Sequence, residues 1–328
     1  MPFPILHTPL VVLSEIISLL EPSGIVTASF CSKNVQRILK RHYQQRKPLE
    51  WKLHMIDDDS EEHVGIETSG RGEHIILAKR ISGLNEPMSL GSNEYGCILV
   101  YSEDQVMASK MVIDYVSGLF NLEVSGLTID RNNIWAIDWI NNRQEQVLED
   151  FYIFGNNKYD GTGDEAMDHA LRNVRASKYF TFEMNVSDNY RFDGNLEPGN
   201  RLLIYAYGHW VTLDNLLSFD FIEITVRGSR LSIPDLYSFI RHWRAGGSPR
   251  LKFLRLEFDH QLDFEHFEDE LEVVERDIAG EYRSRDDHFQ NWRFDHGYCI
   301  QRNDGVKTVI DFGGGHFVMM NWSEIQLK

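Results

Sequence analysis

Two acidic segments carry the side chains most able to hold a metal ion. The first offers carboxylate and imidazole ligands at Asp57, Asp58, Asp59, Glu61, Glu62 and His63. Consecutive like charges in a loop are more typical of a solvated surface than of a cation site. The second, NNKYDGTGDE, is similar to a calcium loop, but aligning Asp160 and Gly161 with its fifth and sixth positions puts Lys158 and Met167 at ligand positions. The favoured interpretation is a chain without a metal or cofactor.

Motifs for catalysis point the same way. The sequence contains no Walker loop, H-E-x-x-H, G-x-S-x-G or C-x-x-C motif. His260, Asp263, Glu265 and His266 gather at the predicted start of a helix, where acidic residues complement the helix dipole. The glycines 313–315 join two predicted strands without a following helix, which indicates a turn rather than a phosphate cradle. A non-catalytic protein is therefore favoured, and a metal-dependent hydrolase using Asp57–His63 or Asp160–Glu165 is the weaker alternative.

Composition limits the classes of partner. The 328 residues are 42% hydrophobic and carry a formal net charge of -17, which disfavours a broad grip on nucleic acid. Cys31, Cys97 and Cys299 are odd in number and far apart, as expected in a reducing compartment. The first apolar run is interrupted too soon for a signal peptide or membrane span. We expect a soluble cytoplasmic or nuclear protein that binds neither nucleic acid nor membrane.

The first forty residues predict three short helices. An apolar stripe with helical spacing runs through the first and continues into the second at Pro9, Leu10, Leu13, Ile16, Ile17, Leu20 and Ile25. Pro22, Ser23 and Gly24 indicate a turn, and Ser32 is a candidate N-cap for the third helix. So small a module cannot enclose its own core, which indicates a docking device.

The third helix has a basic side. Its cationic residues are Lys33, Arg37, Lys40 and Arg41, followed by Arg46 and Lys47. So small a patch on an acidic chain would bind nucleic acid weakly, so an acidic protein partner is the better candidate.

The rest of the chain reads as strands alternating with helices. Residues 48–94 predict a small antiparallel connecting region, and from residue 95 apolar strands recur near Leu99, Leu122, Ile153, Phe182, Ile224 and Leu256. Helices are expected at Asp104–Val116, Asp164–Arg175 and after the N-cap Ser232, which Pro234 and Asp235 support. Such units stack side by side, so we predict a mixed α/β fold with an irregular, leucine-rich-repeat-like strand-helix solenoid. An ordinary α/β domain is the alternative.

A terminal unit follows the last repeat. Phe264, Phe267, Leu271, Val274 and Ile278 have the spacing of an amphipathic helix. Beyond it, YCIQR and VKTVIDF flank Asn303-Asp304-Gly305, a strong hairpin signal, and HFVMMNW is a possible third strand. We expect a C-terminal β-hairpin cap that protects the open end of the stack.

Two segments resemble known families. FPILHTPLVVLSEIISLLEPSGIVTASFCSKNVQRILK is similar to an F-box, with Pro9 retained and Thr8 in place of the usual leucine before it. RLSIPDLYSFIRHWRAGGSPRLKFLRLEF and YCIQRNDGVKTVI resemble the F-box associated type 2 domain of nematode F-box proteins. The resemblance implies an F-box at 1–47, the connecting region at 48–94 and the associated domain at 95–328.

The resemblance also implies a function. F-box proteins are substrate adaptors of SCF-type ubiquitin ligases and perform no bond chemistry themselves. Skp1 would bind the apolar stripe, cullin would be recruited indirectly, and the large domain would hold an unknown protein substrate, raising the local concentration of its lysines. A scaffold that binds Skp1 without cullin is the alternative. Aromatic residues such as Tyr152, Phe180 and Phe182 are more often core than contact, so the sequence does not identify the substrate.

Overall fold

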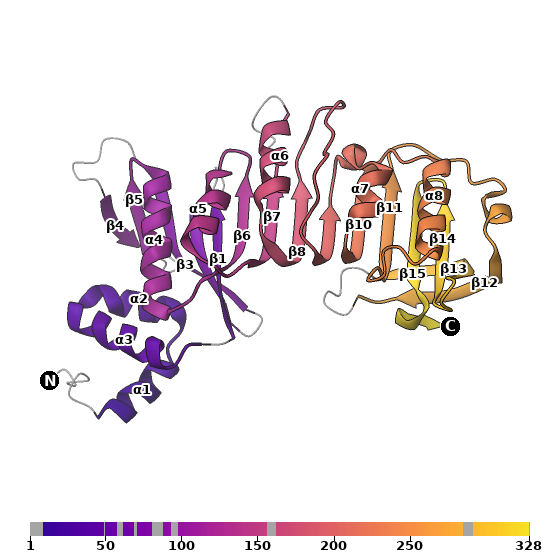
Figure 1. The fold of residues 1–328 in the computed structure, drawn as a ribbon. Coiled ribbons are helices and arrows are strands. Elements are labelled where there is room, and N and C mark those ends of the chain that lie inside the picture. Colours follow the sequence, from indigo (N-terminus) through magenta and orange to yellow (C-terminus); the bar gives the residue numbers. More distant parts are fainter. Residues whose placement is uncertain are drawn as a thin grey trace. The chain divides into compact units, whose positions relative to one another are not determined.

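A computed structural model describes most of the chain and shows a mixed α/β fold (Figure 1). The described ranges are 9–48, 50–57, 62–68, 71–80, 88–92, 98–155, 162–284 and 291–327. The chain divides into two compact units, Met1–Leu148 and Glu149–Lys328. The predicted boundaries after residues 47 and 94 stay a prediction.

The first unit begins with three helices and continues into a sheet. The helices are α1 (Leu10–Ser18), α2 (Pro22–Cys31) and α3 (Lys33–Gln45). The sheet has the order β6-β1-β2-β3-β5-β4. Its strands are β1 (Trp51–Asp57), β2 (Glu62–Thr68), β3 (Arg71–Arg80), β4 (Met88–Ser92), β5 (Ile98–Ser102) and β6 (Val124–Asp130). The predicted antiparallel piece is confirmed, because β2 pairs antiparallel with both β1 and β3.

Two further helices complete this unit. The longer, α4 (Gln105–Phe120), begins at the side-chain cap Asp104 and packs against β1, β2, β3 and β5. It ends at Asn121, whose left-handed backbone (φ 56°) closes the helix. The strand expected around Leu122 therefore begins only at Val124, because Leu119 and Phe120 still belong to α4. The shorter helix, α5 (Trp135–Arg143), was not among the predicted elements.

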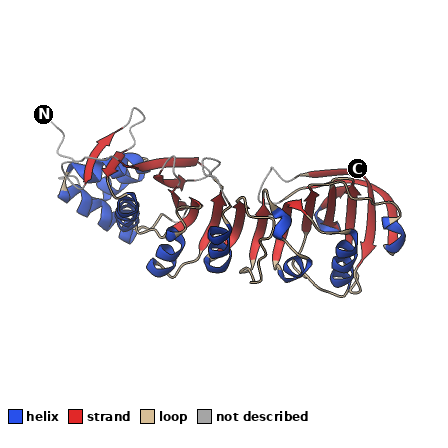
Figure 2. Cartoon of the chain, turned by 90° about the horizontal axis from the view of Figure 1, so that it is seen from above, coloured by secondary structure: helices blue, strands red, loops and turns tan. Residues whose placement is uncertain are grey.

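The second unit is built on parallel strands. It starts with β7 (Leu148–Phe154), and the next strands β8 (Ala176–Glu183), β9 (Gly199–Ile204), β10 (Phe221–Ser229) and β11 (Phe253–Phe258) pair parallel in chain order. The helices are α6 (Asp164–Asn173), α7 (Leu213–Ser218) and α8 (Ile233–Arg244). They lie along one face of the sheet (Figure 2). The sequence did not predict β9 or α7.

The local signals around α8 are confirmed. The Ser232 hydroxyl accepts from the Asp235 backbone N–H, and the Asp235 carboxylate accepts from the Ser232 backbone N–H. Gly246 follows the helix with φ +96°. Leu236, Phe239, Ile240 and Trp243 are all buried. The apolar face of α8 is therefore buried by other parts of the same chain.

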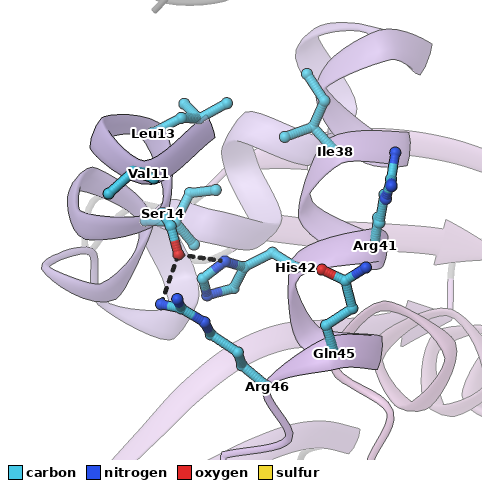
Figure 3. Close-up of a pocket in the computed structure, with 9 residues that line it drawn as sticks. Val11, Leu13, Ser14, Ile38, Arg41, His42, Gln45 and Arg46 are labelled. Carbon is cyan, nitrogen blue, oxygen red and sulfur yellow. Dashed lines mark hydrogen bonds between the residues drawn. The ribbon is translucent and has the colours of Figure 1, made fainter. Parts of the chain in front are cut away.

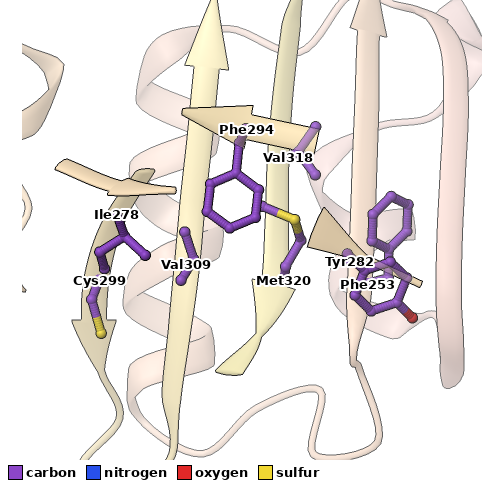
Figure 4. Packing of buried hydrophobic residues seen from close by; sticks show 8 residues of the cluster. All are labelled: Phe253, Ile278, Tyr282, Phe294, Cys299, Val309, Val318 and Met320. Atoms are coloured by element: carbon purple, nitrogen blue, oxygen red, sulfur yellow. The ribbon is translucent and has the colours of Figure 1, made fainter. Parts of the chain in front are cut away.

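Antiparallel strands finish the second unit. These are β12 (Val273–Tyr282), β13 (Trp292–Gln301), β14 (Lys307–Gly313), β15 (His316–Asn321) and β16 (Ile325–Leu327), in the order β16-β12-β13-β14-β15-β11. The predicted hairpin is present, with Arg302 N–H donating to the Val306 carbonyl and Gly305 at φ +92°. A buried cluster closes this end (Figure 4), formed by Phe253, Ile278, Tyr282, Phe294, Cys299, Val309, Val318 and Met320.

The helix predicted after Leu256 is wrong. A 3-10 turn at Phe267–Glu270 replaces its start, and β12 replaces its second half. Phe267 and Leu271 are buried as expected of an apolar face, but Ile278 pairs with Gly297 across the sheet. Pairing with a distant strand overrode the local periodicity.

Candidate partner-binding surface

The three N-terminal helices form because each has a local start signal. Pro9 precedes α1, and Pro22 occupies the first turn of α2, where its missing N–H costs nothing. The turn predicted at Pro22–Gly24 is therefore wrong, because these residues already belong to the helix. Ser32 caps α3 as expected, its hydroxyl accepting from Asn34 and Val35 N–H at 3.1 and 3.4 Å.

Part of the apolar surface of this module is buried inside the first unit. Tyr43 of α3 packs edge-on against Phe120 of α4, with ring centroids 5.0 Å apart, and contacts Trp51 of β1 at 5.7 Å. Phe30 of α2 stacks on Tyr115 of α4 at 4.8 Å. The core that three short helices cannot enclose is thus completed from α4 and β1.

A second part stays exposed, and it lies mainly on α1. The exposed fractions are 73% for Val11, 47% for Val12, 83% for Leu19 and 40% for Leu20. Val12 and Leu19 are seven residues apart with half-buried Ile16 between them, so they form one helical stripe. We call Val11, Val12, Ile16, Leu19 and Leu20 the apolar patch. Exposed apolar residues gathered in this way mark an interaction surface.

The predicted contact residues divide between this patch and the interior. Leu13, Ile17 and Ile25 are buried and hold the helices together. Pro9 and Leu20 are exposed and Ile16 is half-buried, whereas the side chain of Leu10 lies outside the described residues.

Three patch residues, Val11, Val12 and Leu19, were missed. The sequence does carry a signal for them, because most residues of α1 are apolar and such a helix must be covered on more than one side.

A groove of about 250 Å³ lies between α1 and α3 (Figure 3). Val11, Leu13 and Ile38 contribute apolar walls, and Arg41 and Arg46 line its polar side. Arg46 donates to the Ser14 hydroxyl at 2.8 Å, and this hydroxyl lies 3.2 Å from Nδ1 of His42.

The surroundings of the histidine in this groove favour its neutral form. Burial and then Arg46 lower the pKa of His42, against an opposing effect of Glu15. A neutral imidazole can accept the Ser14 proton at Nδ1, so the hydroxyl can bridge His42 and Arg46.

Arg41 and Arg46 line the groove, and further basic side chains lie along α3. Those of α3 and the residues after it are exposed to solvent, namely Lys33, Arg37, Lys40, Arg41, Arg46 and Lys47. Apolar side chains beside an exposed row of cations fit a partner with an apolar face and acidic flanks.

The acidic segments do not assemble into a site among the described residues. Asp57 is buried at the end of β1, residues 58–61 lie outside the described residues, and so do the side chains of Glu62 and His63. Within the described ranges, no group of three or more His, Cys, Asp and Glu side chains could hold a metal ion.

The second acidic segment has a structural role where it is described. Residues 156–161 lie outside the described residues. Asp164 accepts from the Ser187 N–H at 2.7 Å and from its hydroxyl at 2.5 Å. Burial opposes ionisation of Asp164, but these hydrogen bonds outweigh it and lower the pKa of the carboxyl. Asp164 thus ties the start of α6 to the segment after β8.

The histidines near residue 260 also have local partners. His266 is exposed and its Nδ1 lies 3.1 Å from Asp269, within the 3-10 turn that replaces the predicted helix. The dipole explanation offered for this cluster is therefore wrong, because four residues of 3-10 helix follow rather than an α-helix.

Comparison with known proteins gives one match. Residues 193–256 match the family described as F-box associated. The match spans β9, α7, β10 and α8 and reaches into β11. It suggests a substrate adaptor of the F-box type, a non-catalytic class that acts through protein-protein interactions. Neither a curated protein nor a solved structure matches the chain. Among the described helices, none combines the length and apolar character needed to cross a membrane.

Proposed function

We propose that this protein is a substrate-recognition adaptor of an SCF-type ubiquitin ligase. The observation that carries the proposal is the apolar patch along α1 and just after it, which is largely exposed whereas the neighbouring Leu13 and Ile17 are buried. The F-box associated match in the same chain supports an adaptor rather than an enzyme.

In this proposal the N-terminal module is an F-box that binds a Skp1-like protein. Val12, Ile16, Leu19 and Leu20 would contact Skp1 directly, together with Pro9. Leu13, Ile17 and Ile25 would act from inside, by fixing the angle between the helices. A stable interface buries about 1,600 Å² in total, and patch, groove and basic flank together offer several contact elements for it.

The second unit would hold the substrate. Its parallel strands β8–β11 and the helices on one face would form a leucine-rich-repeat-like solenoid, with β12–β16 as the cap. Cullin would be recruited only through Skp1, and the result would be proximity of substrate lysines to the conjugating enzyme.

A test of Skp1 binding must spare the interior of the module. Leu19→Asp with Val12→Asp places charges on the patch without touching a buried side chain, so co-purification with Skp1 should fall at least tenfold. Met107→Asp is the matched control, because Met107 is 53% exposed on α4 of the same unit. Undiminished Skp1 capture by the double variant would refute the F-box assignment.

Co-purification of cullin distinguishes the scaffold alternative from the ligase adaptor. If the chain captures Skp1 but never cullin, the protein is a Skp1-binding scaffold and not a ligase subunit. Capture of both partners supports the adaptor.

A further inference from the structure

The parallel strands of the second unit have one face that the helices do not cover. Side chains alternate along each strand, and Phe182, Ile204, Val226 and Leu256 form one buried set. The other set is buried in part, at Thr225 and at Phe253, which stacks on Tyr282. This second set also brings Arg227 into register beside Glu257 on β10 and β11. The described helices of this unit lie on a single face of the sheet (Figure 2), and because side chains alternate along a strand, the two sets point to opposite faces.

Aromatic and charged side chains form a row across this face. The Arg227 guanidinium lies over the Tyr205 ring at 4.2 Å, and its Nε is 3.3 Å from Glu257. Glu257 also pairs with Arg255, which in turn lies over the Trp292 ring at 4.5 Å. We call Tyr205, Arg227, Glu257, Arg255 and Trp292 the arginine ladder.

The ladder has an excess of positive charge. Among the described residues, Glu257 is the one carboxylate within ion-pair distance of Arg227 or Arg255, so two cations share one anion. The side chains of Arg227 and Arg255 are only 33% and 23% exposed, so water compensates them incompletely. Burial lowers the pKa of Arg255, which agrees with an under-compensated cation.

A groove of about 690 Å³ opens at the carboxyl ends of β9, β10 and β11. Tyr205 and Tyr207 line it and are 43% and 42% exposed, and Arg227 and Glu257 reach it from the ladder. A bulge follows Arg227, where Gly228 has φ +74°. Exposed tyrosines beside arginines are the side chains most enriched at the centres of binding sites.

The carboxylates at the rim of the groove do not cancel the excess positive charge of the arginine ladder. Asp188 is 76% exposed and already pairs with Arg230. Asp259 also lines the groove and is exposed. Exposed carboxylates are hydrated and screened over about 8 Å in physiological salt, whereas the half-buried guanidiniums are not. The charge of the ladder guanidiniums, rather than the net charge of -17 of the whole chain, therefore determines what binds at this groove.

We propose that the arginine ladder and its groove bind an extended acidic segment of a partner protein. A side-chain carboxylate of the segment would take the free donors of Arg227, in competition with Glu257. Apolar or aromatic neighbours of that carboxylate would pack on Tyr205 and Tyr207. The proposal rests on the proposed function in that it names the chemistry of the substrate, but the site itself does not depend on Skp1.

Fluorescence anisotropy of the full chain tests the proposal with defined probes. The probes are short C-terminally amidated peptides that repeat Glu-Ser-Tyr, Gln-Ser-Tyr or Lys-Ser-Tyr. The Glu peptide should bind at least tenfold more tightly than either counterpart, and added salt should weaken it. Equal affinity for the Gln peptide, or preference for the Lys peptide, would overturn the proposal.

Two substitutions in the ladder have opposite expected signs. Arg227→Gln should weaken the Glu peptide about tenfold, because it removes the donor fork. Glu257→Gln should strengthen it severalfold, because it removes the competing carboxylate. A purely structural ladder would give no gain from Glu257→Gln, so unchanged or weaker binding by that variant counts against the proposal.

The control is Arg241→Gln on α8, which removes the same charge from an exposed helix position. It should leave the affinity unchanged; loss equal to that of Arg227→Gln would mean that total charge alone is being measured. A fall in oligomeric state for Arg227→Gln without an effect on peptide binding would make a second copy of the chain the occupant and overturn the choice of partner.

Failure here and failure of the proposed function are distinguishable. Arg227→Gln should co-purify with Skp1 as well as the unmodified chain, since it leaves the N-terminal module intact. Skp1 capture without peptide binding overturns the ladder alone, whereas peptide binding without Skp1 capture overturns the adaptor alone.

Discussion

Helices α1 and α8 are both rich in apolar residues, but they use them differently. Helix α8 has a side-chain cap at Ser232, a polar outer side and four buried apolar residues. Helix α1 has no side-chain cap, and its first-turn Val11 and Val12 face solvent. The difference shows that the apolar side of α8 is buried, whereas the outer side of α1 stays exposed, as the proposed partner binding requires.

Truncating one large apolar residue of α8 and one at the C-cap of α1 should give the largest contrast. Trp243→Ala removes a side chain that is 2% exposed, and we expect it to lower the free energy of unfolding by about 3–5 kcal/mol. Leu19→Ala, at 83% exposure, should change it by less than about 0.5 kcal/mol. Urea denaturation followed by circular dichroism measures both. Similar losses would erase the distinction between the two helices.

The contact of Tyr43 with Phe120 and Trp51 should make the free energy of unfolding depend on pH. Burial raises the pKa of Tyr43 to about 12 from 10.0. A raised pKa means that the stabilising neutral form is fully present below about pH 10 and is lost as the pH rises through about 12. Tyr43→Phe should therefore lose less stability between these pH values than the unmodified chain does, as shown by urea midpoints at both ends. An identical decline in both proteins would contradict the burial of this hydroxyl.

The smallest expected effect concerns the cap of α8. Ser232→Ala removes the hydroxyl that accepts from Asp235 N–H, so we expect a cost of about 1 kcal/mol. Ser18→Ala near the end of α1 removes only a hydrogen bond to the Glu15 carbonyl at an exposed site. Thermal denaturation should show little change for that control. If Ser232→Ala left the stability unchanged, packing alone would define the start of α8.

Elements with local signals were predictable from the sequence. Ser232, Gly246 and the spacing of Leu236, Phe239 and Trp243 fix α8 without knowledge of the rest of the chain. The first half of β12 could not be recognised in this way, because Val273 finds its partner at Ile300. Its apolar residues happen to have helical spacing, and only the distant strand decides against a helix.

The candidate surface was predictable in part for a related reason. The sequence places apolar residues on every side of α1, but it does not show which side the chain covers. Leu13 and Ile17 lie beside α3 and are buried, whereas Val12 and Leu19 stay exposed. The arginine ladder depends on strand register between Arg227 and Glu257, which periodicity cannot supply.

The contacts of Tyr43 with Phe120 and Trp51 have a mechanical consequence. Three aromatic rings from α3, α4 and β1 meet at centroid distances of 5.0 to 5.7 Å, and side chains packed in this way resist rotation. Within the first unit, these contacts hold α3 against α4 and β1. A force applied to α3 is therefore passed directly to β1 and α4, because the three rings leave little free space between these elements.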